Sequence, residues 1–343
     1  MCQTWREKNF LINEEDFEAK MQETVLPLLK ADIREEYFTS RDGSRIHTEY
    51  MINPDEKAAI VISHGFCEFA GKYHEMMYYM YKCGYSVFFI DHRGHGYSDK
   101  CDVDPDMVYV KSFQEYVDDF ADFIEHIAKK RSRTGKLYLF AHSMGGAIAA
   151  MYLEQFPDTF EKAVLSSPMI EMRYGSYSMI AVRALMLLSV VLHWQKKYMP
   201  GQHGFDNVNV YETSSAISRS RYEYAFALRQ SDKHFQTYGG SYSWGRAGMA
   251  ASAYIKKHAG DVRTPILLLQ AGNDSLVRPE AQDYFVKHTA HTSFIRYEDS
   301  KHEIFNAGDE TRYKYYDDVF TFLNALVFRE NCQWQAIYMH RQV

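Results

Sequence analysis

The stretch of sequence that decides the fold is Phe140-Ala141-His142-Ser143-Met144-Gly145-Gly146. An apolar, strand-like run at 136–140 leads into it, and a helix-like run at 146–155 follows at once. Where a strand turns directly into a helix, the corner residue has a strained backbone and its side chain projects away from both elements. Small neighbours are needed there because a Cβ would collide with the adjoining strand or helix. The pattern therefore predicts an exposed hydroxyl on Ser143, with the positive end of a helix behind it.

Helix-like and strand-like segments alternate along most of the chain, which favours an α/β fold with a mostly parallel sheet flanked by helices. Residues 1–32 read as an acidic, partly helical lead-in, and residues 33–169 with 262–343 are expected to form the core. From 170 to 261 the alternation stops, and Met- and aromatic-rich helical segments and polar loops replace it. An insertion at this point, after the sixth strand, is predicted to be a helical cap, or lid.

The individual elements are predicted from short apolar runs for strands and longer amphipathic runs for helices. We expect strands at 58–63, 85–90, 137–140, 163–166, 265–270 and 293–297, a hairpin over 35–52 around Arg41-Asp42-Gly43-Ser44, and helices at 72–83, 112–130, 146–156, 279–287 and 313–328.

Composition narrows the class of protein. A chain of 343 residues suits one large α/β domain with an insertion. The net charge of −6 gives no basic face for nucleic acid. The 16 Met and 15% aromatic residues favour an adaptable apolar pocket. Scattered cysteines without metal-ligand spacing indicate reduced thiols in a cytosolic protein. These cysteines are Cys2, Cys67, Cys83, Cys101 and Cys332.

The N-terminal sequence is charged between Arg6 and Asp16 and has no apolar core of a secretory signal, which again favours a cytoplasmic protein. The longest apolar stretch, at 179–194, contains Arg183 and is too short to span a bilayer. We expect it to be a buried or lid helix. The alternative is a lid that lies on a membrane, which would matter for a lipid substrate and would place the protein at the inner membrane face. The sequence does not fix the oligomeric state.

A serine hydroxyl is a weak nucleophile near neutral pH unless an oriented base takes its proton. Such partners are expected at the carboxyl ends of later strands, where open α/β sheets build their sites. Asp274 and His302 each follow a predicted strand, in that order after Ser143. We therefore expect His302 to take the proton of Ser143 and Asp274 to orient His302. Asp299 is a rival acid, but it lies three residues from His302 on the same loop.

An oxyanion formed at the attacked carbonyl also needs hydrogen-bond donors. The strand predicted at 58–63 ends in His64-Gly65-Phe66-Cys67-Glu68, and a His-Gly turn there presents a backbone N–H toward the serine corner. We expect the donors to be the N–H groups of Phe66 and of Met144, the residue after the serine. The alternative is a plain turn at His64-Gly65.

The segment Asp91-His92-Arg93-Gly94-His95-Gly96-Tyr97-Ser98 follows the strand predicted at 85–90. Its two glycines allow a tight turn, and Asp91 and Arg93 can hold the loop by hydrogen bonds. We interpret it as scaffold. Its histidines lack a carboxylate or cysteine partner at suitable spacing, so no metal site is predicted.

Several of these segments resemble the α/β-hydrolases, and within them the lysophospholipase L2 and monoacylglycerol lipase group of S33-type hydrolases. The resemblance covers roughly residues 35–328 and implies Ser143, Asp274 and His302 as a catalytic triad beneath a helical cap. Two positions depart from the family pattern: Ala141 replaces a glycine at the serine corner, and Cys67 stands where monoacylglycerol lipases usually carry glycine. The segments that carry the resemblance are 64–68, 71–73, 91–98, 141–147, 265–270 and 301–304, with 239–244 similar to bacterial lysophospholipase L2.

The leading hypothesis is a cofactor-free serine hydrolase that cleaves carboxylic esters through an acyl-enzyme. The apolar insertion favours a small-molecule or lipid ester, such as a lysophospholipid or a monoacylglycerol. The substrate pocket is expected near Phe66 and Met144, and its further candidate residues are His142, Met169 and Trp244.

Two other classes of protein stay open. A non-catalytic protein that binds a small ligand on the same fold would be expected to carry a broken triad, and none is visible. An aminopeptidase would use the same triad but would need acidic cap residues for a substrate ammonium. The cap offers Glu171, Asp206, Glu212, Glu223 and Asp232.

Overall fold

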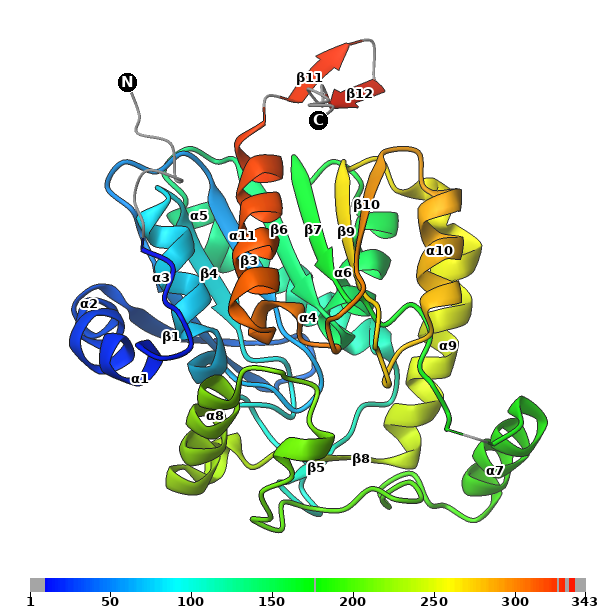
Figure 1. Cartoon of the computed structure of the whole chain (residues 1–343). Coiled ribbons are helices and arrows are strands. Elements are labelled where there is room, and N and C mark those ends of the chain that lie inside the picture. Colours follow the sequence, from blue (N-terminus) through cyan, green and yellow to red (C-terminus); the bar gives the residue numbers. More distant parts are fainter. Residues whose placement is uncertain (1–9, 176, 326, 331–332, 337–343) are drawn as a thin grey trace.

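The computed structural model describes residues 10–175, 177–325, 327–330 and 333–336 (Figure 1). Its main sheet has the strand order β1-β2-β4-β3-β6-β7-β9-β10, in which only β1–β2 and β2–β4 pair antiparallel. The predicted α/β fold with a mostly parallel sheet is confirmed. The strands are β1 (Arg34–Thr39), β2 (Arg45–Met51), β3 (Ala59–Ser63), β4 (Ser86–Ile90), β6 (Leu137–His142), β7 (Lys162–Ser166), β9 (Ile266–Ala271) and β10 (Thr292–Tyr297).

The central strands are buried on both faces, as parallel strands covered by helices must be. In β3, Ile60 and Ile62 pack into one apolar cluster while Ala59 and Val61 pack into the other. Successive side chains of a strand point to opposite faces, so one short apolar run supplies both halves of the core. The sheet is thus the middle layer of three.

Helices cover both faces of this sheet, and in Figure 1 α11 crosses in front of it while α6 lies behind it. Four helices pack on the face of the sheet to which Ile60 and Ile62 point: α1 (Phe17–Lys20), α2 (Leu26–Asp32), α3 (His74–Lys82) and α11 (Asp309–Asn324). Four others pack on the opposite face, to which Ala59 and Val61 point: α4 (Phe113–Phe123), α6 (Met144–Gln155), α9 (Tyr242–His258) and α10 (Pro279–His288). A π-helical turn at Met21–Val25 joins α1 to α2, and another at Ile124–Ala128 joins α4 to α5 (Lys129–Arg131).

The described part of the N-terminal lead-in, which starts at residue 10, packs into the core. Phe17, Met21, Val25 and Leu29 recur every four residues and are all buried in the layer that contains α3 and α11. Apolar residues at this spacing share one face of a helix. The described lead-in is therefore packed against the domain along its length.

The insertion, residues 170–261, follows β7, the sixth strand of the main sheet in chain order. It contains α7 (Met179–Val191), α8 (Arg219–Ser231) and α9, and α9 packs on α4, α6 and α10 as well as on α7. Since α9 contacts both the core helices and the rest of the insertion, the predicted boundary between core and cap stays a prediction. Among the helices that the structure describes, none has the length and apolarity needed to cross a membrane.

The structure differs from the predicted secondary structure at two places, the bounds of one helix and an unpredicted strand. The helix predicted at 313–328 begins earlier, at Asp309, where acidic residues suit the positive end of a helix, and it ends at Asn324 because Ala325 is extended. The apolar pair after it belongs to β11 (Val327–Glu330), which pairs with β12 (Gln333–Ala336). Inside the insertion, where no strand is predicted, β8 (Gly239–Gly240) pairs with β5 (Met107–Val108). A strand made of two glycines has no alternation of side chains by which the sequence could indicate it.

Candidate active site

Ser143 occupies the corner between β6 and α6 with a backbone φ of +53°. The strained corner predicted from the sequence is confirmed. The two following glycines are required sterically, since a Cβ on Gly145 would lie 2.1 Å from the carbonyl oxygen of Ser63 and one on Gly146 would lie 2.6 Å from Pro168. The prediction of an exposed hydroxyl was wrong, because Ser143 is only 7% exposed and the ring of His302 lies against its oxygen.

The structure brings together three of the predicted site residues. His302 Nε2 lies 2.7 Å from the Oγ of Ser143, and His302 Nδ1 lies 2.6 Å from Oδ2 of Asp274. Asp274 follows β9 and His302 follows β10, so both project from the carboxyl ends of neighbouring parallel strands. The rival acid, Asp299, is exposed on the same loop as His302.

The carboxylate of Asp274 is held in its charged form. Its second oxygen accepts hydrogen bonds from the backbone N–H groups of Leu276 (2.8 Å) and Val277 (3.1 Å). Burial raises the pKa of Asp274, but His302 and these two N–H groups together lower it below its ordinary value. A fixed anion at this position keeps a proton on Nδ1 of His302 and leaves Nε2 free to accept one from the serine.

The loop formed by residues 64–68 lies beside this serine corner. Among the described residues, the backbone N–H groups of Phe66 and Met144 have no hydrogen-bond acceptor, which leaves them available for a ligand oxygen. Cys67 has a φ of +58°, a conformation that favours glycine and explains why a glycine is usual here. Burial raises the pKa of the Cys67 thiol to about 12, so it is no competing nucleophile.

A buried charge network that the sequence analysis missed supports the 64–68 loop. Glu68 accepts hydrogen bonds from the N–H of Gly65 (2.6 Å), the hydroxyl of Tyr73 (2.5 Å) and Nζ of Lys72 (2.8 Å). Lys72 also pairs with Glu303, the residue after His302, at 2.7 Å. Burial raises the pKa of both carboxyls, but the charge of Lys72 and the hydrogen bonds that the two groups accept together lower it below its ordinary value, so both stay charged. The one available signal was the i, i+4 spacing of Glu68 and Lys72.

The 91–98 loop behaves as the predicted scaffold. Arg93 pairs with Asp119 at 2.6 Å and with Asp42 at 2.7 Å, while Asp91 accepts hydrogen bonds from His47 (2.8 Å) and from the N–H of Tyr97 (3.1 Å). The loop is therefore tied to β2, α4 and the first hairpin. In the described part of the chain, no three His, Cys, Asp or Glu side chains are grouped to hold a metal ion.

The candidate pocket residues occupy different places. His142 is buried with its ring centroid 4.9 Å from that of His302. Met169 is buried and its N–H donates to the carbonyl oxygen of Ser143 at 2.9 Å. Trp244 is buried with its ring centroid 4.3 Å from that of Phe66, so α9 of the insertion contacts the 64–68 loop directly.

Among the described cysteines, Cys67 and Cys101 are free thiols, Cys67 being buried and Cys101 half-buried. Cys2 and Cys332 lie outside the described residues.

Comparisons with known proteins agree with this architecture. The profile of the family described as serine aminopeptidase, S33, matches residues 54–309. The chain is 31% identical to lysophospholipase L2 of Escherichia coli K12 over 226 residues. The matched region spans 66% of this chain and 66% of that protein, just under two thirds of its length. It is 30% identical to the monoglyceride lipase of Mus musculus over 70% of this chain and 73% of that protein. A carboxyl esterase from Bacillus coagulans superposes with a TM-score of 0.69 at 15% identity, covering 85% of this chain and 98% of the other.

Proposed function

We propose that this chain, which belongs to the α/β-hydrolase family described as serine aminopeptidase, S33, hydrolyses carboxylic esters of the lysophospholipid or monoacylglycerol type. The observation that carries the proposal is the continuous hydrogen-bond chain from Ser143 through His302 to Asp274, with distances of 2.7 Å and 2.6 Å. The named relatives, a lysophospholipase and a monoglyceride lipase, support an ester of this class.

In the proposed reaction, Oγ of Ser143 attacks the ester carbonyl while its proton moves to Nε2 of His302. Asp274 stabilises the imidazolium that forms. The carbonyl oxygen becomes an anion, and the free N–H groups of Phe66 and Met144 are its proposed donors. His302 then protonates the leaving alcohol. A water molecule next attacks the acyl-enzyme and gives a proton to His302, which returns it to Oγ of Ser143 as the carboxylic acid is released.

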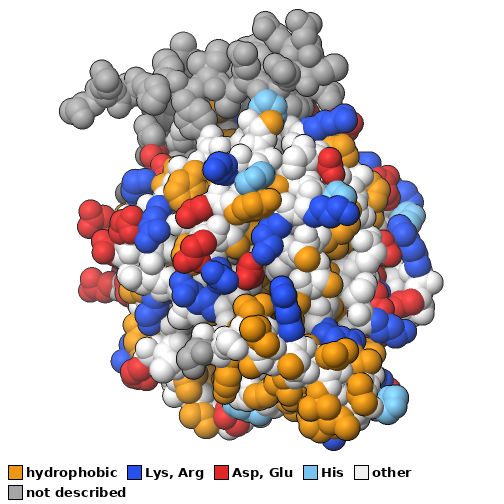
Figure 2. All heavy atoms as spheres, turned by 90° about the vertical axis from the view of Figure 1, so that its right-hand side faces the viewer, with side chains coloured by type: hydrophobic (Ala, Val, Ile, Leu, Met, Phe, Trp, Pro, Cys, Tyr) orange, Lys and Arg blue, Asp and Glu red, His pale blue; other side chains and the backbone are white. Residues whose placement is uncertain are grey.

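A lipid-like substrate is supported by the surface of α7. Apolar side chains gather at the lower end of the face shown in Figure 2, where α7 lies. Between Arg173 and Phe205 the sequence contains basic residues but no Asp or Glu, which suits an anionic lipid surface. We propose that α7 contacts the lipid aggregate from which the substrate comes. The most exposed apolar residues of this surface are Tyr177, Ile180, Leu187 and Val191.

The same structure gives less support to an aminopeptidase, the class for which the family is named. A substrate ammonium would need a free carboxylate near the serine. Glu171 is instead paired with Lys256 (2.6 Å) and Arg278 (3.1 Å), and Asp232 accepts hydrogen bonds from Tyr97 and His234. The remaining acids of the insertion are exposed or half-buried on its surface: Asp206, Glu212, Glu223 and Asp261.

The test combines covalent labelling with a comparison of substrates. A fluorophosphonate should label Ser143, and 4-nitrophenyl esters of rising chain length should be hydrolysed faster than aminoacyl anilides. Faster anilide turnover would favour the peptidase, and a protein without label on Ser143 would favour a non-catalytic binding protein. Lysophospholipid and monoacylglycerol should then be compared directly as substrates.

The variant Ser143→Ala gives the sharpest single result. It should fold normally and lose ester turnover by roughly 10⁴- to 10⁶-fold, as removal of a triad nucleophile generally does. Near-normal turnover by a pure sample of this variant would contradict the proposed role of Ser143.

A further inference from the structure

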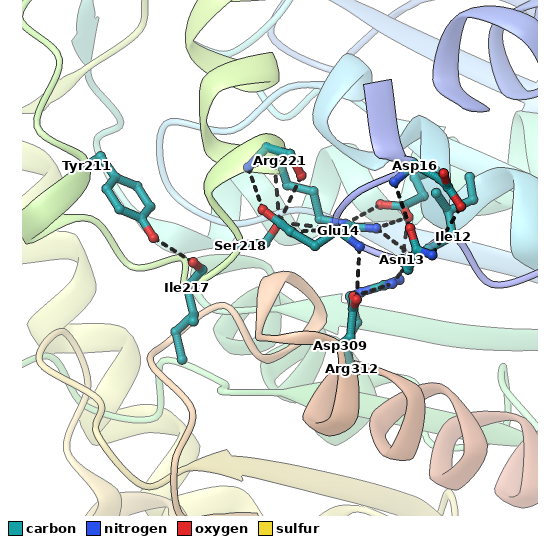
Figure 3. Close-up of polar contacts among 12 residues, drawn as sticks. Ile12, Asn13, Glu14, Asp16, Tyr211, Ile217, Ser218, Arg221, Asp309 and Arg312 are labelled. Carbon is teal, nitrogen blue, oxygen red and sulfur yellow. Dashed lines mark hydrogen bonds and ion pairs between the residues drawn. The ribbon is translucent and has the colours of Figure 1, made fainter. Parts of the chain in front are cut away.

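The helix α8 of the insertion reaches the core through two arginines at opposite ends, Arg221 and Arg229. The Arg221 end is a buried clamp in which the guanidinium donates to Glu75 (2.6 and 2.8 Å), to Glu14 (3.1 Å) and to the carbonyl oxygen of Ile12 (3.0 Å). Figure 3 shows Arg221 pointing at the N-terminal segment, where Glu14 lies between it and α11. One end of α8 is therefore fixed to the core independently of the candidate active site.

The other end of α8 reaches the 64–68 loop. The guanidinium of Arg229 donates to the carbonyl oxygen of Cys67 and, at 2.9 Å, to that of Thr237. Cys67 is the residue with a φ of +58°, and it directly follows Phe66, whose N–H is the proposed oxyanion donor. A non-glycine residue in this conformation is unfavourable and persists only where its surroundings fix it. Arg229 supplies such a contact.

The guanidinium of Arg229 is itself held in place. It lies 5.4 Å from the ring centroid of Phe69, and that ring stacks on Phe235 with centroids 4.3 Å apart. Thr237, which accepts its second hydrogen bond, donates in turn to the carbonyl oxygen of Gly94 in the scaffold loop at 2.9 Å. The arginine thus links two core loops through the insertion.

Within the loop, Glu68 accepts from the N–H of Gly65 and so fixes the residue before Phe66. Arg229 fixes the residue after it. Arg229 binds the carbonyl oxygen of the Cys67–Glu68 peptide, and the N–H of that same peptide donates to the carbonyl oxygen of Gly65 at 3.3 Å. Because the Gly65 carbonyl and the Phe66 N–H belong to one planar peptide, this contact fixes the direction of the Phe66 N–H.

We propose that Arg229 is a positioning residue that holds the Phe66 N–H in the oxyanion hole, so that the hole is complete only while α8 is docked on the core. This inference rests on the proposed ester hydrolysis and adds the part of the insertion that shapes the transition-state site. Arg229 acts through Cys67 and touches no reacting atom.

The experiment compares Arg229→Ala with the wild-type protein on a soluble 4-nitrophenyl ester. We expect kcat to fall about 10- to 100-fold, somewhat less than for complete loss of an oxyanion donor, while KM changes by less than about twofold. The control is Arg219→Ala on the same helix, because Arg219 is 66% exposed and contacts only other residues of the insertion, Glu223 at 3.6 Å and the ring of Tyr211 at 5.0 Å, among the described residues; it should retain wild-type kcat.

A merely structural role is separated by two ketone inhibitors of the same chain length. With a trifluoromethyl ketone, Oγ of Ser143 bonds to the carbonyl carbon, the serine proton moves to His302, and the oxyanion occupies the proposed hole. Its affinity should fall in Arg229→Ala by the same factor as kcat, whereas the affinity of the weakly electrophilic methyl ketone should not change. Added guanidinium ion should restore part of the lost kcat.

Unchanged kcat in Arg229→Ala, or a loss of kcat without loss of trifluoromethyl ketone affinity, would overturn the inference. If Arg229→Ala does not fold, Arg229→Lys, which keeps the charge and one donor, is tested by the same two inhibitors and should show a smaller but parallel loss. Absence of any ester turnover by the wild-type protein would instead reject the proposed function, so the two failures are distinguishable.

Discussion

The helices α7 and α8 belong to the same insertion but are attached to the core in opposite ways. α8 is fixed by charged side chains: Arg221 is only 3% exposed and is paired with Glu75, and Arg229 reaches the 64–68 loop. α7 packs its few buried side chains on α9 and leaves Ile180 83% exposed. Directional hydrogen bonds fix a helix in one position, whereas a small apolar contact permits sliding. The two helices of the insertion therefore differ in what attaches them to the core.

The largest test of this contrast removes the clamp on α8. Arg221→Ala should lower the free energy of unfolding by about 3–5 kcal/mol, because it leaves the buried carboxylate of Glu75 without its main partner. Urea unfolding followed by circular dichroism measures the change. Arg219→Ala, at an exposed position of the same helix, should stay within about 0.5 kcal/mol of the wild-type value. Equal effects of the two variants would remove the basis for calling α8 fixed.

The second test concerns the apolar surface of α7. The triple variant Ile180→Ser, Leu187→Ser, Val191→Ser should lower partitioning onto anionic vesicles by about 10-fold or more, because it removes the exposed apolar side chains. Sedimentation with vesicles measures the binding. Turnover of a soluble ester should change by less than about twofold, since the substituted side chains are exposed and the buried side chains of α7 that pack on α9 are kept.

The matched control for this second test is Leu187→Ser alone, which should shift vesicle binding in the same direction by a smaller factor. Vesicle binding unchanged in the triple variant would show that α7 covers the protein without contacting lipid, and the contrast with α8 would then concern packing alone.

The sequence predicts those site residues whose place is set by the strand that they follow. Ser143, Asp274 and His302 each follow a strand, and parallel strands bring their carboxyl ends to one edge, so their convergence could be foreseen. The strained corner could be foreseen as well, because only a direct strand-to-helix junction explains an apolar run, a serine and two glycines in succession.

The contacts that hold the insertion could not be predicted in this way. Arg221 and Glu75 are 146 positions apart, and Arg229 and Cys67 are 162 positions apart. An arginine on a polar helix reads as solvent-facing, and nothing local identifies a partner so distant in the chain. The pairing of Gly239 with Met107 could not be predicted either, because glycine has no side chain whose apolarity would indicate a buried strand.

The smallest expected effect is a difference in how the two helices respond to acid. Burial raises the pKa of Glu14, but hydrogen bonds from Ser218 and Ser220 and the charge of Arg221 together lower it by more. The pKa of Glu14 therefore lies below its ordinary value of 4.5. A carboxyl whose pKa is lowered by folding stabilises the folded state at pH values above its ordinary pKa. This stabilisation is lost as the pH falls through the pKa of the folded state. Hydrogen exchange at α8 should therefore accelerate severalfold more than at α7 between pH 5 and about pH 3, after correction for intrinsic rates.

The matched variant for this comparison is Glu14→Gln, which keeps the size of the side chain but cannot titrate. Its α8 should already exchange faster than wild type at pH 6 and should respond less to acid, while α7, whose sequence from Met179 to Val191 contains no acidic residue, should be unchanged. If α7 and α8 respond to acid equally in the wild-type protein, the clamp at Glu14 does not distinguish them. The difference between the two helices would then rest on Arg221 with Glu75 and on Arg229, whose donor groups do not titrate in this range.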